Sequence, residues 1–586
     1  MGTGFMIDGP LRVAKFGISS AISLVDDVLI EQMRKFHSHR AGESYEEIGP
    51  RDEDARARRI TAYLNLLDRL VRRQVEALQA SPFEPGSEIT RYFELLPDSP
   101  PLRAYREMLA TDDPQRRREL QERLRALAVP GTIDVNIMSK GDRDAYRDGQ
   151  KLPARFSDAS AALRGYAQST LRSSIIFSAG INPRLYGYAA EFDDFLPDAG
   201  GALKKKIVLK VSDYHSAVVQ GRFLAKRGLW VSEYRVESGL NCGGHAFATK
   251  GLLLGPILDE FQRNRESLTD QMHAEYVRSL ARQGRVAPSR PQPVRFTVQG
   301  GIGTAAENAM LHEVYGVDGT GWGTPFLLVP EVSNVDDEHL AKLRAASNGD
   351  VWLSDSSPFG MPFWNLRTSA SEEARRRRIA EGRPGSACIK GYVQLFNTEF
   401  TSQPICTASR QYQELKLRQL DAQDMSDARR AAMREYVLAK SCICHDLAGG
   451  VSRKNGLDPT ATPAICCGPG ITSFSKIATL EEMVGHIHGR LSLVTDPNRP
   501  HMFIRELELY LDFLRRELKS RELGLSSNPP EYFREFKENL LDGIEYYRRF
   551  AAFLPEEARG RFIKELETLR ETLEAAPLAA ISENTH

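Results

Sequence analysis

The most informative stretch of this chain is Glu237-Ser238-Gly239-Leu240-Asn241-Cys242-Gly243-Gly244-His245. It directly follows an apolar run, Leu229 to Val236, whose composition predicts a buried strand. Gly243 and Gly244 would let the backbone approach a bound ligand, because glycine has no Cβ and tolerates positive φ. His245 would point into the same space, and histidine is the side chain best suited to moving protons near neutral pH.

Two more glycine clusters follow strand-like runs. Gln299-Gly300-Gly301-Ile302-Gly303-Thr304 comes after Val294 to Val298, and Gly319-Thr320-Gly321-Trp322-Gly323-Thr324 closes the next run. Three strand-then-glycine units in series predict a parallel barrel with a phosphate-bearing cofactor at its C-terminal rim. The alternative is that these glycines only form tight turns between strands and helices. The G-x-G-x-x-G fingerprint is absent, which argues against a Rossmann dinucleotide site.

Strand-like runs alternate with helical stretches along the first part of the chain, which implies parallel strands joined by right-handed crossovers. Seven runs are identified: Leu11–Phe16, Ile133–Met138, Ser174–Phe177, Ile207–Val211, Trp230–Val236, Val294–Val298 and Gly316–Trp322. An eighth strand is expected between the first run and Ile133, but no segment there identifies it. The expected fold is therefore an α/β protein of the (β/α)8 TIM-barrel type.

The remaining segments are predicted to be mostly helical. In residues 35–128 the apolar side chains recur with the period of a helix, which predicts a helical insertion after the first strand. The insertion belongs to a predicted barrel domain of residues 1–347. An extension containing cysteine and glycine covers 348–480, and a helical region covers 481–586. In that last region, leucines at helical spacing from Leu507 to Leu518 predict core or subunit contacts.

Composition restricts the class of protein. The chain has 586 residues and a formal net charge of zero, which gives no support to nucleic-acid binding driven by charge. No apolar run is long enough to cross a membrane, and the start shows no secretory signal. Seven cysteines in such a chain favour reduced thiols, so we expect a cytoplasmic protein.

The motifs together resemble those of the nitronate monooxygenase (2-nitropropane dioxygenase-like) flavoproteins, which are FMN-binding (β/α)8 barrels. The matching pieces are Asn241 through His245, Gly300-Gly301-Ile302 and Gly319 through Phe326. Asp134 to Ser139 looks like the family strand that lies along the flavin. Lys210 looks like a lysine of a superfamily member, the enoyl reductase subunit of polyunsaturated fatty acid synthases. Asn241-Cys242 departs from the Glu or Ser, then Ala, that the family often has.

The resemblance implies FMN as cofactor and His245 as the catalytic acid/base beside the flavin ring. The implied cofactor-binding residues are Asn136, Lys210, Gly243, Gly244, Gly300, Gly301, Gly303, Gly321, Gly323 and Thr324. Two reactions remain open, oxidation of alkyl nitronates with oxygen and reduction of an enoyl thioester with NAD(P)H as reductant. The implied partners are a small-molecule or acyl-thioester substrate, an acyl carrier or electron-transfer protein, and a second copy of the chain. The alternatives are a non-catalytic flavin-binding or scaffold protein and a flavin enzyme with an additional iron–sulfur cluster.

Cysteines gather in the extension. The candidate metal ligands are Cys406, Cys442, Cys444, Cys466 and Cys467, and Cys388 lies further upstream. Several thiols in a small region could hold an iron–sulfur cluster or zinc. However, the C-x-C and C-C spacings differ from the common C-x2-C, and adjacent cysteines cannot easily bind one ion. A metal centre and a set of buried thiols both remain open.

Overall fold

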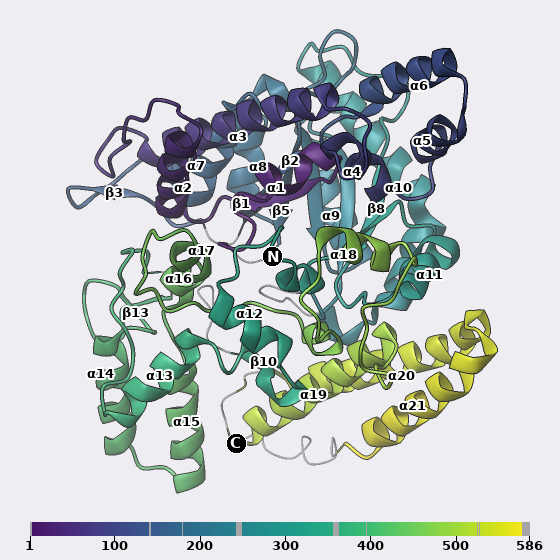
Figure 1. Ribbon diagram of the computed structural model, residues 1–586. Coiled ribbons are helices and arrows are strands. Elements are labelled where there is room, and N and C mark those ends of the chain that lie inside the picture. Colours follow the sequence, from purple (N-terminus) through teal and green to yellow (C-terminus); the bar gives the residue numbers. More distant parts are fainter. Residues whose placement is uncertain are drawn as a thin grey trace.

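A computed structural model describes residues 3–139, 142–178, 180–241, 249–354, 362–393, 395–523, 526 and 528–576. Its centre is a curled parallel sheet of seven strands (Figure 1). In spatial order these are β1 (Ser20–Ser23), β2 (Ile133–Met138), β5 (Ser174–Ser178), β6 (Lys206–Val211), β7 (Val231–Glu237), β8 (Arg295–Gln299) and β9 (Gly319–Gly321). The predicted α/β class with parallel pairing is confirmed. In the described residues β1 and β9 remain edge strands, so the sheet does not close into the predicted eight-stranded barrel.

The prediction of a strand over Leu11–Phe16 is wrong. This segment forms helix α1 (Gly9–Val13) and the 3-10 turn η1 (Ala14–Phe16). Pro10 suits the first turn of a helix, and Gly17, at φ 76°, ends the turn in the left-handed conformation. The first strand is β1, and it pairs directly with β2 from Ser20 opposite Ile133. No eighth strand lies between them in this sheet.

Helices cover the convex face of the sheet. They are α7 (Asp158–Ala167), α8 (Pro183–Ala189), α9 (Tyr214–Ala225), α10 (Leu254–Arg282) and α11 (Ala305–Tyr315). The strands bury alternate apolar side chains against these helices, such as Val135 of β2 and Leu209 of β6, both with zero exposure. This apolar layer forms the main core.

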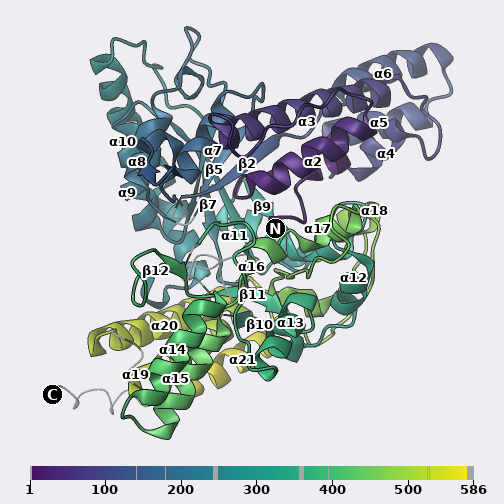
Figure 2. The same cartoon turned by 90° about the vertical axis from the view of Figure 1, so that its left-hand side faces the viewer.

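Five helices lie between β1 and β2. They are α2 (Asp27–Arg40), α3 (Ala55–Ala80), α4 (Glu88–Leu95), α5 (Pro100–Ala110) and α6 (Pro114–Leu127). Helix α3 buries its stripe of Ile60, Leu64 and Leu67 and packs on α2 and α7. The helices α4–α6 extend sideways from the sheet (Figure 2).

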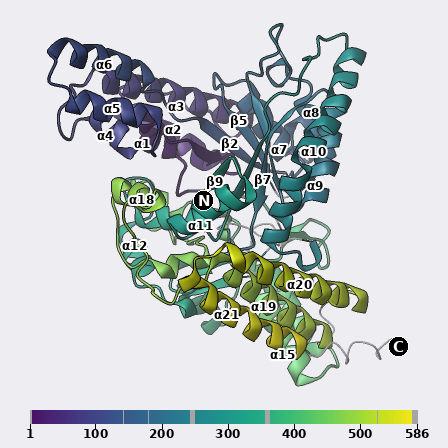
Figure 3. The ribbon, with the colours of Figure 1, turned by 90° about the vertical axis from the view of Figure 1, so that its right-hand side faces the viewer.

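The chain after the sheet is mostly helical and lies beyond the carboxyl ends of the strands (Figure 3). Its longer elements are α12 (Asp337–Arg344), β10 (Val351–Ser354), β11 (Phe363–Leu366), α13 (Ala370–Ala380), α14 (Arg410–Ala422), α15 (Asp427–Ala439), α17 (Gly449–Lys454), α18 (Leu480–Ile487), α19 (Met502–Glu522), α20 (Pro530–Phe550) and α21 (Glu556–Glu574). The stripe from Leu507 to Leu518 is buried, as predicted for a core contact. The domain boundaries at 347 and 480 stay predictions. No helix in the described ranges is long and apolar enough to cross a membrane.

Candidate functional site

The concave face of the sheet carries many polar side chains beside the apolar Ile176 and Val208, in contrast to the apolar convex face. Strand alternation and register place one set of side chains there: Asp134, Asn136, Lys210, Glu233, Arg235, Glu237, Thr297 and Gln299. The interior of an ordinary parallel barrel is filled by layers of bulky branched residues. A charged interior is therefore a departure that calls for a functional explanation.

Near the carboxyl ends of the strands, Glu237 is the centre of a small network. The Lys210 Nζ lies 2.6 Å from its Oε1. The side-chain amide of Gln299 donates to the same oxygen at 3.0 Å, and that of Asn241 also donates to it. Lys210 is thus held as one member of an ion pair at the rim.

A second network lies deeper on the same face. Arg235 Nη2 lies 2.7 Å from Glu233 Oε1, and the Thr297 hydroxyl donates to that oxygen at 2.6 Å. Asp134 accepts the Ser174 amide at 2.9 Å, and burial raises the pKa of this carboxyl above its ordinary value. Side chains of the concave face therefore form hydrogen bonds and ion pairs both deep in the face and at its rim, and the face carries positive and negative charges.

The loops after β7, β8 and β9 start at one rim because these strands are neighbours. Glu237 pairs with Gln299, which pairs with Gly321. Gly300 and Gly301 have φ of 99° and 80°, a conformation that favours glycine. A Cβ on Gly300 would lie 2.8 Å from the backbone nitrogen of Asn241. Glycine here lets the loop after β7 touch the loop after β8.

The Gly303 amide already has an acceptor within the chain. Its amide donates to Glu307 Oε2 at 2.8 Å, so it already binds an anion of the chain itself. A Cβ on Gly303 would lie 2.5 Å from the guanidinium of Arg499. Arg499 pairs with Glu307 at 2.6 Å and donates to the Gly301 carbonyl at 2.9 Å. Burial would raise the pKa of Glu307, but Arg499 and the hydrogen bonds outweigh it and lower this pKa.

Other backbone amides of the second and third glycine clusters have no such acceptor. The Thr324 hydroxyl accepts the Gly468 amide at 3.2 Å. A Cβ on Gly321 would lie 2.9 Å from the Gln299 Cβ. Among the described residues, no acceptor takes the amide hydrogens of Gly301, Gly323 or Thr324. These three amides lie at the ends of the neighbouring strands β8 and β9.

The late part of the chain covers this rim. Trp364 Nε1 donates to the Gly239 carbonyl at 3.2 Å, and His486 Nε2 lies 3.0 Å from the Gly303 carbonyl. Together with Arg499, these contacts anchor a cover over the loops after β7 and β8. No local spacing in the sequence predicts this cover, because its contacts join residues far apart along the chain.

Glu506, on α19, is a buried carboxyl next to the loop after β7. One oxygen accepts the Ser238 hydroxyl at 3.2 Å. The other accepts the Leu254 amide at 2.9 Å and the Tyr547 hydroxyl at 3.2 Å. Burial raises the pKa of Glu506 to about 7, against the effect of these hydrogen bonds. Glu506 could not be recognised as a site residue from the sequence because it lies inside a helical apolar stripe.

Cys242, Gly243, Gly244 and His245 lie outside the described residues. Cys466 and Cys467 are buried in a second apolar cluster with Leu240, Leu327 and Ile465. Cys388, Cys406, Cys442 and Cys444 are half-buried free thiols.

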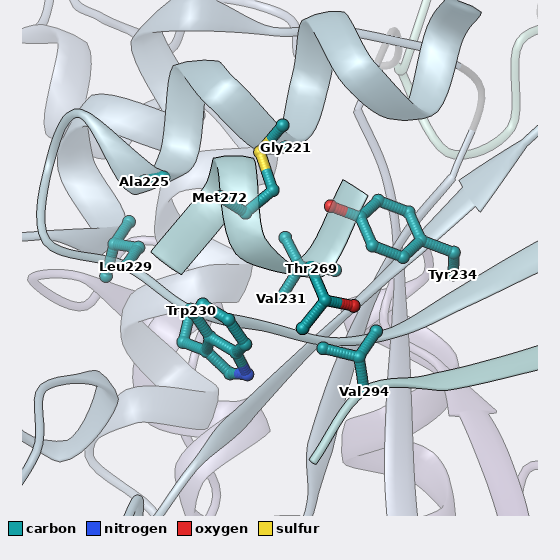
Figure 4. A pocket seen from close by; sticks show the side chains of 9 residues that line it. All are labelled: Gly221, Ala225, Leu229, Trp230, Val231, Tyr234, Thr269, Met272 and Val294. Carbon is teal, nitrogen blue, oxygen red and sulfur yellow. The ribbon is translucent and has the colours of Figure 1, made fainter. Parts of the chain in front are cut away.

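Two other features of the structure carry no candidate chemistry. A narrow apolar hollow lies between α9, α10 and β7, lined by residues such as Trp230, Tyr234 and Met272 (Figure 4). It belongs to the convex side, away from the charged face. Asp336, Glu338 and His339 lie close together, but both His339 nitrogens are engaged. Nδ1 is 2.9 Å from Asp336, and Nε2 accepts the Ala370 amide at 3.0 Å.

Comparison with known proteins found a similarity among solved structures only. No protein-family model and no curated protein matches the sequence. Among solved structures, the chain is similar to the enoyl reductase domain of MlnA from the macrolactin biosynthesis cluster of Bacillus amyloliquefaciens. The identity is 14%, the TM-score is 0.34, and the match covers 69% of this chain and 90% of the other. A similarity at this level assigns neither a family nor an activity.

Proposed function

We propose that this chain is an FMN-dependent oxidoreductase. The observation that supports it best is the meeting of three loops, after β7, β8 and β9, at one rim above a charged concave face. In parallel α/β folds, ligands bind at the carboxyl ends of the strands, where loop amides and helix N-termini attract phosphate.

The phosphate would be held by the amides of Gly301, Gly323 and Thr324, which no acceptor of the described chain uses. Gly300 and Gly321 serve by allowing close backbone approach. Gly303 stays outside the donor set, because its amide holds Glu307. The glycines Gly243 and Gly244 belong to the proposal as part of the loop after β7.

The ring would lie along the concave face, beside Asn136 and Lys210. When bound, FMN supplies the redox chemistry, and the protein orients it and tunes its electronics. The Lys210–Glu237 pair fixes the ammonium at the rim, where it can interact with an electron-rich ring or substrate oxygen. His245 would transfer a proton to or from the substrate carbon.

The substrate is proposed to carry a nitro or carbonyl group that acidifies the adjacent carbon. The two versions are nitronate oxidation with oxygen and enoyl-thioester reduction with NAD(P)H. The second would use an acyl carrier or electron-transfer protein as partner. A cytoplasmic location and self-association stay predictions.

Purified full-length protein tests the proposal. We expect it to retain FMN through gel filtration and to retain riboflavin far less, because the amides bind the phosphate. Bleaching of the flavin by NAD(P)H would indicate the reductase version, and bleaching by an alkyl nitronate the oxidase version. A His245→Gln variant should keep the flavin and lose turnover. Protein that takes up no FMN contradicts the proposal, and FMN binding with neither bleaching supports the scaffold alternative.

A further inference from the structure

Helix α19 carries a carboxyl group inside its apolar stripe. Glu506 is 2% exposed, and its neighbours along the helix include the buried Phe503, Leu507 and Tyr510. No lysine or arginine in the described part of the chain forms an ion pair with it. A buried carboxyl group costs free energy unless hydrogen bonds satisfy it, so its hydrogen-bond partners indicate what it does.

The contacts of Glu506 reach both ends of the loop after β7. Ser238 is the first residue after the strand, and its hydroxyl donates to Oε1 at 3.2 Å. Leu254 is the first residue of α10, and its amide donates to Oε2 at 2.9 Å. These partners lie 268 and 252 positions away along the chain. One carboxyl group of a late helix thus joins the beginning and the end of this loop.

The start of α10 depends on groups from the last helices. Leu253, the residue before the helix, provides no side-chain cap. Glu506 accepts the Leu254 amide, and the Tyr547 hydroxyl of α20 accepts the Gly255 amide at 3.3 Å. Helices α19 and α20 both pack on α10 (Figure 3). Free amides and the helix dipole favour a carboxylate at a helix N-terminus, so Glu506 replaces the missing cap.

Ser238 organises the turn that follows β7. Its hydroxyl oxygen accepts the Leu240 amide at 3.2 Å, and its carbonyl accepts the Asn241 amide at 3.1 Å. The Asn241 side chain donates to Glu237, which is the ion-pair partner of Lys210. A chain of hydrogen bonds therefore connects the buried carboxyl of α19 with the charged pair on the concave face.

We infer that Glu506 is a positioning residue for the proposed reaction. It holds the turn at 238–241 and the start of α10 in one arrangement, so that the loop between them presents its side chains to the concave face. That loop carries His245, the proposed acid/base, and proton transfer requires such a group within hydrogen-bond reach of the substrate. The inference rests on the proposed function.

Glu506→Leu tests the inference in full-length protein saturated with FMN, because it removes the acceptor for both ends of the loop. Turnover is measured with an alkyl nitronate and with NAD(P)H plus a short enoyl thioester. We expect kcat to fall at least tenfold. The Kd for FMN should change less than about threefold, because the amides proposed to hold the phosphate lie in the loops after β8 and β9.

A conservative variant and a matched control accompany this measurement. Glu506→Gln should keep kcat within about threefold of the wild type, since its amide oxygen can accept the Leu254 amide and its NH2 group can donate to the Ser238 hydroxyl oxygen. The control Ser279→Ala removes another buried serine hydrogen bond of α10, to the Lys226 carbonyl at 2.9 Å. It should leave kcat unchanged.

Hydrogen exchange tests the loop contacts without any ligand. The amides of Leu240, Asn241 and Leu254 should exchange at least tenfold faster in Glu506→Leu than in the wild type. Ser238→Ala leaves the α10 contact in place, so it should accelerate exchange in the turn alone and still lower kcat. This second variant decides the question if Glu506→Leu does not fold.

Two results overturn the inference. Wild-type kcat in folded Glu506→Leu or Ser238→Ala protein would show that these contacts do not position the reacting groups. A parallel fall in kcat and FMN affinity would assign Glu506 to the general stability of the site. Wild-type protein that takes up no FMN contradicts the proposed function instead, and hydrogen exchange then still shows whether the carboxyl holds the loop.

Discussion

The two faces of the seven-stranded sheet differ in chemistry. The convex face carries apolar side chains such as Val135 and Leu209, which helices cover completely. The concave face carries charged side chains such as Lys210 and Glu237, and at its rim the later chain adds Arg499 opposite Glu307. Substitutions in the apolar convex layer are therefore expected to change stability alone, whereas buried charges at the rim stabilise the fold beside the proposed ligand site, and four substitutions test this comparison.

The largest effect is expected at the rim. Arg499→Met removes the partner of the buried Glu307 carboxylate, and breaking a buried ion pair from one side costs about 3–5 kcal/mol. Chemical denaturation measures the loss. The double variant Arg499→Met/Glu307→Gln should recover part of it, because no unpaired charge is then buried. A single variant as stable as the wild type would show that the pair does not hold the cover.

On the convex face, Leu209→Ala should lower the free energy of unfolding by about 2–5 kcal/mol, since it leaves a cavity in a fully buried layer. FMN affinity, measured below the unfolding transition by fluorescence quenching, should stay within about twofold. A large loss of affinity in folded Leu209→Ala protein would mean that the two faces are not independent.

Glu506 should make stability depend on pH. Its pKa is raised to about 7 in the folded protein, so between its ordinary value near 4.5 and 7 the folded state binds more protons than the unfolded state. The free energy of unfolding should therefore fall as pH rises through this window, by up to about 3 kcal/mol. Glu506→Gln mimics the neutral carboxyl and should flatten this dependence in denaturation at pH 5 and pH 8. An unchanged slope would assign the dependence to other groups.

The smallest effect on stability is expected for Lys210→Met. The pair with Glu237 is partly exposed, and Gln299 and Asn241 still donate to that carboxylate. The cost should be about 1 kcal/mol or less. Turnover or FMN affinity should nevertheless fall at least tenfold. If turnover and FMN affinity are both unchanged in the folded variant, Lys210 has a structural role and is not part of the site.

Much of the sheet could be predicted because strands leave local signals. The runs at Ile133–Met138 and Ile207–Val211 are apolar or alternate in a period of two, and both are strands. Leu11–Phe16 has a similar short apolar run but is helical. Pro10 and Gly17 decide this locally, and packing on α3 completes it. A short apolar run by itself cannot distinguish a strand from a helix.

The candidate site, like the sheet, could be predicted from the sequence only in part. The glycine clusters could be recognised because certain backbone conformations favour glycine, and the pairing of neighbouring strands brings the loops after β8 and β9 to one rim. No sequence pattern predicts the contacts of Arg499, Glu307 and Glu506, because the residues that they contact include some that lie hundreds of positions away along the chain.

The sequence by itself determined the parallel α/β class, most strand positions and the glycine-bearing loops, because periodicity and residue type act over a few neighbours. Only the tertiary structure decided that the sheet stays open in the described residues, that Gly303 holds Glu307 and that the late helices cover the rim. Those outcomes depend on which distant groups satisfy a buried charge or hydrogen-bonding group, and no local pattern specifies such a partner.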